Sequence, residues 1–377
     1  HPVAHSFPTR RSSDLYRDAA LEYMRISDEP LPDGSENGHA DDAPFTFIDL
    51  FAGIGGFRIA HENLGGHCVF TSEWDKFAQE SYFANFGDLP FGDITSEKVK
   101  SLIPDRFDVL CAGFPCQAFS IAGRRGGFAD TRGTLFHDVA EIIRRKKPRA
   151  VFLENVKGLV NHDRGKTLRT ILHVLREDLG YTVPEPQIMN ARHFGVPQNR
   201  ERIFIVGFRD KREAENFSYP EPFDERVTFE EVKEEEPVSV KYYLSTQYLE
   251  TLREHRRRHE AKGHGFGYEI IPDDGIANAI VVGGMGRERN LVYDDRLTDF
   301  TPVTKIKGEV NREGIRRMTP REWARLQGFP ETYRIVVSDG QAYKQFGNSV
   351  AVPAIQATAQ KILEAINIRE HVPQGHH

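Results

Sequence analysis

One cysteine in this sequence has a setting that favours chemistry over packing. Cys116 follows Pro115, just after an apolar run from Val109 to Ala112 that predicts a short buried parallel strand. In open α/β sheets, ligands bind beyond the carboxyl ends of such strands, so the thiol would face whatever enters that crevice. A structural thiol is the alternative, but the loop position favours a nucleophile. Cys68 and Cys111 lie within strand patterns and are expected to be small core residues.

A glycine-bearing turn between a strand (residues 45–51) and a helix (residues 57–64) indicates a half-site for a nucleoside. The turn contains Gly53, Gly55 and Gly56. It lacks the spacing of the dinucleotide fingerprint, and Asp49 just before it would repel phosphates. A cationic sulfonium cofactor such as S-adenosylmethionine therefore fits these charges better than NAD. A nicotinamide dehydrogenase stays as a distant alternative.

Two further strand ends supply groups that suit a nucleoside. Glu73 lies twenty positions after Gly53, which suits a carboxylate that accepts hydrogen bonds from ribose, and Trp74 could cover an adenine face. A third strand is expected to end at Asp93 and Ile94, which could bind the exocyclic amine and the other face of the base. Each carboxylate alone could equally be a surface group. Together, at successive strand ends, they favour the pocket.

A carboxyl and two arginines are expected at the same edge as Cys116. Residues 149–156 predict a strand with Glu154 near its carboxyl end, where flanking apolar residues would raise the pKa of the carboxyl. A later strand, residues 198–207, carries Arg200 and Arg202 at its entrance. An acid, two cations and a thiol would then converge at one site.

Alternating strands and helices of this kind predict an α/β fold with a mostly parallel, Rossmann-like sheet covered on both faces. We expect a catalytic and cofactor-binding domain over residues 45–209 and a smaller domain over residues 210–315. A returning segment spans residues 316–366, and tails span residues 1–44 and 367–377. The first tail reads as disordered, with residues 1–11 as candidates for a segment foreign to the natural gene.

Bulk composition narrows the class of protein further. The chain has 377 residues, a net charge of −6 and no apolar run long enough to span a bilayer. Three cysteines without paired spacing favour a reducing cytosol over a disulfide framework. The total charge gives no sign of a nucleic-acid partner, but such binding depends on local clusters of basic residues. Each basic cluster in this sequence, taken alone, is better interpreted as solvated surface.

The smaller domain contains a glycine-rich stretch, residues 283–290, in which Arg287, Arg289 and Asn290 could reach base edges. A plain hairpin loop is nearly as good an interpretation of these residues alone. Residues 117–134 form a second glycine- and arginine-bearing segment, which we interpret as a lid over the site.

Ordered blocks along the chain resemble the DNA (cytosine-5)-methyltransferases of bacterial restriction–modification systems. The resemblance spans residues 45–366. Its blocks are residues 49–56, 113–117, 154–156, 198–202, 319–328 and 347–349. The block at residues 283–290 also resembles enzymes that modify CCGG.

This resemblance implies a role for each site residue. Cys116 would be the nucleophile and Glu154 would hold cytosine N3, with Arg202 and Arg200 around it. The S-adenosylmethionine pocket would take Phe51, Gly53, Gly55, Glu73, Trp74, Asp93, Ile94, Pro115, Leu135, Asn348 and Val350. Double-stranded DNA would contact Gln117, Ser120, Arg124, Arg132, Arg287, Arg289 and Asn290. No metal site is expected.

The resemblance also implies a monomeric, cytoplasmic and nucleoid-associated bacterial enzyme that methylates a flipped-out cytosine and protects host DNA. A restriction endonuclease would act on the same site. Two alternatives stay open. A transfer-RNA cytosine-5 methyltransferase would share the same core, and a non-catalytic DNA-binding relative would lack turnover.

Overall fold

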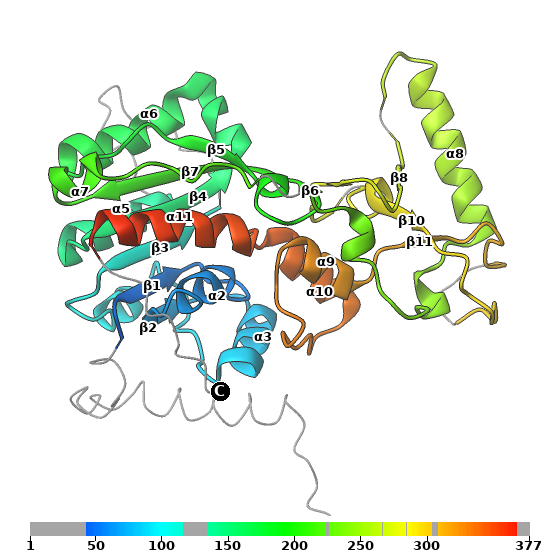
Figure 1. Cartoon of the computed structure of the whole chain (residues 1–377), viewed down its shortest axis with the longest axis horizontal. Coiled ribbons are helices and arrows are strands. Elements are labelled where there is room, and N and C mark those ends of the chain that lie inside the picture. The colour runs from blue at the N-terminus through cyan, green and yellow to red at the C-terminus, as the bar shows by residue number, and fades with distance from the viewer. Residues whose placement is uncertain are drawn as a thin grey trace, which may run out of the picture.

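A six-stranded sheet forms the centre of the computed structural model, which describes residues 43–115, 134–223, 226–265, 267–283, 285–303 and 308–367. The strand order is β2-β1-β3-β4-β7-β5 (Figure 1). These strands are β1 (Thr46–Leu50), β2 (His67–Ser72), β3 (Val109–Gly113), β4 (Ala150–Val156), β5 (Gln187–Asn190) and β7 (Glu201–Phe208). The first four are parallel, whereas β7 runs antiparallel to β4 and β5 antiparallel to β7. This confirms the predicted mostly parallel α/β sheet.

Both faces of the sheet are buried because its central strands are apolar on both sides. Along β3, Val109 and Cys111 join one core cluster, whereas Leu110 and Ala112 join the other. This alternation follows from the two-residue period of a strand. Helices α2 (Gly56–Glu62) and α11 (Val352–Ala365) pack together over the first face, so the last helix completes a core begun by the first strand. Helix α5 (Leu135–Lys146) covers the second face.

The remaining elements of the sheet region connect these layers. The α-helices are α3 (Lys76–Phe86), α4 (Glu97–Ser101), α6 (Lys166–His173) and α7 (Lys211–Glu215). The single-turn elements are η2 (Lys157–Val160), η3 (His162–Gly165), η4 (Val174–Asp178) and η5 (Ala191–His193). The helix expected over residues 166–179 is thus α-helical only to His173 and continues as the π-helical turn η4.

A second region lies beside the sheet in Figure 1 and is built from shorter strands. A three-stranded sheet has the order β11-β10-β8, and β6 pairs with β9. These strands are β6 (Gln198–Asn199), β8 (Ile270–Ile271), β9 (Ala277–Asn278), β10 (Leu291–Tyr293) and β11 (Ile315–Arg317). Its helices are η6 (Phe229–Glu231), η7 (Val240–Tyr242), α8 (Thr246–Glu260), η8 (Glu288–Asn290), α9 (Pro320–Leu326) and α10 (Asp339–Asn348).

Two predicted strands differ in the structure. The strand expected over residues 198–207 is broken at Arg200 into β6 and β7, and β6 leaves the large sheet to pair with β9. The strand expected before Asp93 is reduced to a single bridge, in which Phe91 pairs with Ser72. Pro90 has no N–H to donate, which limits pairing on that side. Within the described ranges, no helix combines the length and hydropathy needed to cross a bilayer.

Candidate functional site

The carboxyl edge of the sheet brings an acid and a cation together. Arg202 Nε lies 3.1 Å from Glu154 Oε1, and Glu154 is 8% exposed. The antiparallel direction of β7 explains the pairing, because the start of β7 then lies beside the end of β4, with Arg202 opposite Val156. Burial raises the pKa of Glu154, and the nearby guanidinium groups of Arg202 and Arg200 oppose that rise without cancelling it. The carboxyl can therefore hold its proton more readily than a solvated Glu.

The end of β3 lies directly against this carboxyl. Gly113 is the register partner of Glu154, and a Cβ at Gly113 would come within 3.4 Å of Glu154 Oε2. Asn155 Nδ2 donates a hydrogen bond of 2.8 Å to the Phe114 carbonyl, which fixes where the chain leaves the sheet. The carboxyl end of β3 at Gly113 therefore lies beside Glu154. Cys116 itself lies outside the described residues, as do Gln117, Ser120, Arg124 and Arg132.

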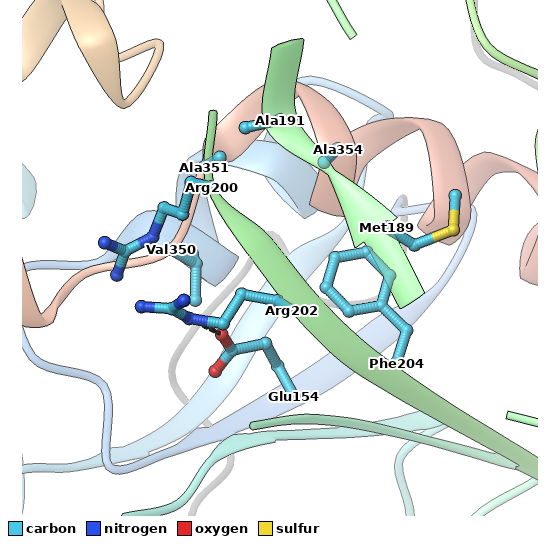
Figure 2. A pocket seen from close by; sticks show the side chains of 9 residues that line it. All are labelled: Glu154, Met189, Ala191, Arg200, Arg202, Phe204, Val350, Ala351 and Ala354. Atoms are coloured by element: carbon cyan, nitrogen blue, oxygen red, sulfur yellow. Dashed lines mark ion pairs between the residues drawn. The ribbon is translucent and has the colours of Figure 1, made fainter. Parts of the chain in front are cut away.

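A pocket with about 220 Å³ of empty space, part of it open to solvent, lies next to the Glu154–Arg202 pair (Figure 2). It is lined by Glu154, Met189, Ala191, Arg200, Arg202, Phe204, Val350, Ala351 and Ala354. Residues from β4, β7 and the start of α11 thus meet here, although they are far apart in sequence. Sequence reasoning found the charged members and Val350 but missed the apolar wall. In the sequence, the apolar residues that line the pocket have the same pattern as ordinary core residues, so nothing there marks them as part of a site.

Arg200 lines this pocket yet makes no direct ion pair in the described structure. Its side chain is buried and donates to the carbonyls of Ile280, Gly347 and Ser349. Burial, together with the charge of Arg202, lowers the pKa of Arg200. Arg200 is therefore bonded to backbone carbonyls, whereas Arg202 forms an ion pair with the Glu154 carboxyl.

The glycine turn adopts the backbone that its residues predict. Gly53 and Gly55 have φ of +56° and +87°, and Phe51 has φ of +58°. A side chain at Gly55 would collide with the Phe86 ring. Glu73 stabilises the turn, because its Oε2 accepts from Gly53 N and its Oε1 from Asp75 N, both at 2.8 Å. Each oxygen keeps a lone pair for a further donor.

The expected adenosine groups surround this turn with different exposures. Trp74 is 75% exposed, which is rare for so large an apolar side chain and leaves its face open to a ligand. Asp93 is exposed, and its Oδ1 accepts from Thr95 N, whereas Ile94 is buried. Burial raises the pKa of Glu73 from its usual value.

The remaining expected pocket residues connect the turn to the Glu154 side. Val350 is buried between Gly56 and Gly113, and a Cβ at Gly56 would collide with it. Pro115 and Asn348 are exposed, and Leu135 begins α5 and is half-buried. Val350 thus joins the glycine turn to the end of β3, so the predicted nucleoside site and the Glu154 side of the sheet edge are contiguous.

Three of the seven residues expected to contact DNA belong to the described structure, and they have three different environments. Arg287 is exposed, with its guanidinium over the Tyr343 ring. Arg289 pairs with Glu269 at 3.2 Å.

Asn290 is fully buried. Its Oδ1 accepts from Asn278 N and its Nδ2 donates to Asn278 O. Both ends of this amide are engaged by backbone, so Asn290 does not present it to a base edge here. The sequence alone could not separate these three residues, because side-chain burial inside a turn has no periodic signal.

Comparisons with known proteins agree with this geometry. The family model for C-5 cytosine-specific DNA methylase matches residues 45–364. The chain is 70% identical to the type II methyltransferase M.HpaII of Haemophilus parainfluenzae over 353 residues, covering 94% of this chain and 97% of that protein. It is 41% identical to the type II methyltransferase M.HhaI of Haemophilus parahaemolyticus, covering 86% of this chain and 96% of that protein.

Solved structures extend the likeness in fold. The Dnmt2 methyltransferase of S. pombe superimposes with a TM-score of 0.62 at 18% identity, over 86% of this chain and 99% of that one. A putative DNA modification methyltransferase of E. coli gives 0.53 at 20% identity, over 86% and 99%. At these identities the structural likeness concerns the fold alone, whereas the family match covers most of the chain. The chain belongs to the C-5 cytosine-specific DNA methylase family.

Proposed function

We propose that this protein is the modification enzyme of a type II restriction–modification system. It transfers a methyl group from S-adenosylmethionine to C5 of cytosine in duplex DNA, within the sequence CCGG. The observation that carries the proposal is the buried Glu154–Arg202 pair beside the strand end that leads to Cys116. The identity with M.HpaII and the glycine-rich recognition block support the target sequence.

The residues around the glycine turn fit S-adenosylmethionine. The exposed Trp74 ring can cover adenine, and the Glu73 carboxylate can accept from ribose hydroxyls while it holds Gly53. Asp49 is 1% exposed, and both its oxygens lack a hydrogen-bond partner in the described structure. Burial raises the pKa of Asp49 well above its usual value, so this carboxyl favours its neutral form and the fit to the cofactor rests on Trp74 and Glu73. When bound, the cofactor supplies an electrophilic methyl group for C5 of the base.

The chain's own groups make C5 nucleophilic. The Cys116 thiolate adds to C6 and forms an S–C6 bond, which breaks the aromaticity of the ring and gives C5 enamine character. Glu154 donates a proton to N3, so the charge that the thiolate brings into the ring is neutralised, and Arg202 holds the carboxyl in position. After methylation, a water molecule accepts the C5 proton, and the electron pair of that C–H bond re-forms the C5–C6 double bond and expels the Cys116 thiolate. Glu154 takes back the N3 proton, which leaves neutral 5-methylcytosine.

The cytosine must leave the duplex before this chemistry, at a cost of a few kcal/mol in unstacking and unpairing. Cations on the 117–134 segment and the exposed Arg287 would offset that cost through phosphate and groove contacts.

Methyl transfer from labelled S-adenosylmethionine tests this function. Duplex DNA containing CCGG should become labelled, and bisulfite sequencing should map one cytosine within each CCGG. Labelling of total transfer RNA in place of duplex DNA would favour the RNA-modifying alternative. DNA binding without any label would favour a non-catalytic relative. Label at other sequences would contradict the proposed CCGG target and leave the proposed methyl transfer to DNA in place.

A further inference from the structure

Arg200 lies at the junction of three chain segments that the large sheet does not otherwise connect. It interrupts the chain between β6 and β7, and the neighbouring β6 pairs with β9 of the second region. Its Nη1 donates to Ile280 O at 2.8 Å, and its Nη2 donates to Gly347 O at 3.1 Å and to Ser349 O at 2.6 Å. One guanidinium therefore binds both the segment after β9 that leads to residues 283–290 and the end of α10 before Val350.

Two buried glutamines extend this junction. Gln198 is 0% exposed; its Oε1 accepts from Ile280 N, and its Nε2 donates to Leu326 O at 2.8 Å and to Gln327 Oε1 at 3.2 Å. Gln327 Nε2 in turn donates to Phe346 O at 2.7 Å. The Ile280 backbone is thus bound at both its N–H and its carbonyl by side chains of the β6–β7 connection.

A buried guanidinium without a direct carboxylate partner is costly to desolvate, and hydrogen bonds offset part of that cost. Nη1 and Nη2 of Arg200 are hydrogen-bonded, whereas its Nε is buried without a partner in the described structure. Here all three bonds end on backbone carbonyls from outside β7, so they fix where those segments lie relative to Glu154. Val282, two residues after Ile280, packs against Gly347, where a Cβ would lie 2.9 Å from the Val282 side chain. The two segments are therefore also in close contact at Gly347.

We propose that Arg200 is a positioning residue that couples the cofactor side of the site to the DNA-reading region. Its hydrogen bonds to Gly347 and Ser349 tie it to the segment that ends in Val350. Its hydrogen bond to Ile280 fixes the position of the segment that leads to Arg287. Filling the cofactor pocket then favours the arrangement that binds duplex DNA, and duplex DNA favours cofactor binding by the same factor. This inference rests on the proposed function for the identity of the two ligands.

Binding measurements test the coupling without requiring turnover. Duplex affinity is measured by fluorescence anisotropy with and without saturating S-adenosylhomocysteine, in the parent protein and in Arg200→Lys. We expect S-adenosylhomocysteine to tighten duplex binding of the parent several-fold and that factor to fall toward one in Arg200→Lys. Lysine keeps the charge but cannot donate to Ile280, Gly347 and Ser349 from one planar group.

Two further variants separate positioning from catalysis and from folding. Arg202→Lys contacts Glu154 rather than the junction, so it should slow methyl transfer and keep the coupling factor of the parent. Gln198→Met removes the amide bonds to Ile280 but keeps the side-chain volume, and it should lower the coupling factor if the junction acts as a unit. Thermal melting identifies any variant that has lost its fold.

A coupling factor of one in the parent protein would overturn the proposal, and so would an unchanged factor in both folded Arg200→Lys and folded Gln198→Met. Slowed chemistry with intact coupling in Arg200→Lys would instead make Arg200 a substrate contact. Because the readout is binding, failure of methyl transfer to CCGG would leave this result interpretable.

Discussion

Arg202 Nε lies 3.1 Å from Glu154 Oε1, and both residues belong to adjacent antiparallel strands of the central sheet. The guanidinium favours the charged carboxylate, but burial favours the neutral acid more, and the pKa of Glu154 is raised. A carboxyl held in this way is oriented by one neighbour and can still carry a proton. That combination is what an acid facing N3 of cytosine requires.

Glu154→Gln should slow methyl transfer by about 100- to 10,000-fold, because the amide keeps the shape but cannot deliver a proton to N3. Single-turnover labelling of a CCGG duplex at saturating cofactor measures this step. Glu201→Gln is the matched control, since Glu201 lies on the neighbouring strand β7, is half-exposed and pairs with Lys157. A near-normal rate in Glu154→Gln would remove the proposed role.

The raised pKa of Glu154 also predicts a dependence of stability on pH. Below the ordinary value of 4.5 the carboxyl is protonated in both folded and unfolded chains and contributes nothing. Above the raised pKa it is ionised in both states and destabilises the folded one. The free energy of unfolding of Glu154→Gln, relative to the parent, should therefore rise between pH 4 and pH 8. Urea denaturation at several pH values measures it, and a constant or falling difference would contradict the burial argument.

Trp74→Ala should weaken binding of S-adenosylhomocysteine by about 10-fold or more, because stacking on a base is worth about 1–3 kcal/mol. The melting temperature of the free protein should change little, since the ring is 75% exposed. Isothermal titration measures the affinity, and Trp74→Phe should retain part of it. Equal affinities for Trp74→Ala and the parent would place adenine elsewhere.

Asn290→Ala and Arg287→Gln should have opposite signatures. Loss of the Asn290 amide leaves the N–H and carbonyl of Asn278 unsatisfied in a buried turn, at a cost of about 1–3 kcal/mol that lowers the melting temperature. Arg287→Gln should keep the melting temperature and weaken binding to CCGG relative to a mismatched duplex. If Asn290→Ala keeps the melting temperature of the parent and loses only selectivity for CCGG, the proposed structural role of Asn290 is contradicted.

Much of the sheet could be predicted from local sequence, because its central strands β3 and β4 contain apolar runs, Val109 to Ala112 and Ala150 to Leu153. The run from Val109 to Ala112 needs burial on both faces, and only a central parallel strand supplies it. The carboxyl-edge positions of Glu73 and Glu154 follow from that arrangement.

Long-range pairing could not be predicted in the same way. Arg200 stands in a run that reads as one strand, and it breaks that strand because its side chain is bonded to Ile280 and Ser349. Both partners lie more than 75 residues away, so no local pattern signals the break. The burial of Asn290 depends in the same way on Asn278 across a turn.

A covalent trap tests the central claim most directly. A CCGG duplex carrying 5-fluorocytosine blocks release, since the C5 fluorine cannot leave as a proton does. Incubation with S-adenosylmethionine should give a stable protein–DNA adduct on denaturing gels, with the DNA attached to the peptide that contains Cys116. The parent protein should form the adduct and Cys116→Ser should not, while both bind S-adenosylhomocysteine equally. No adduct with the parent, or an adduct on Cys68 or Cys111, would contradict the account.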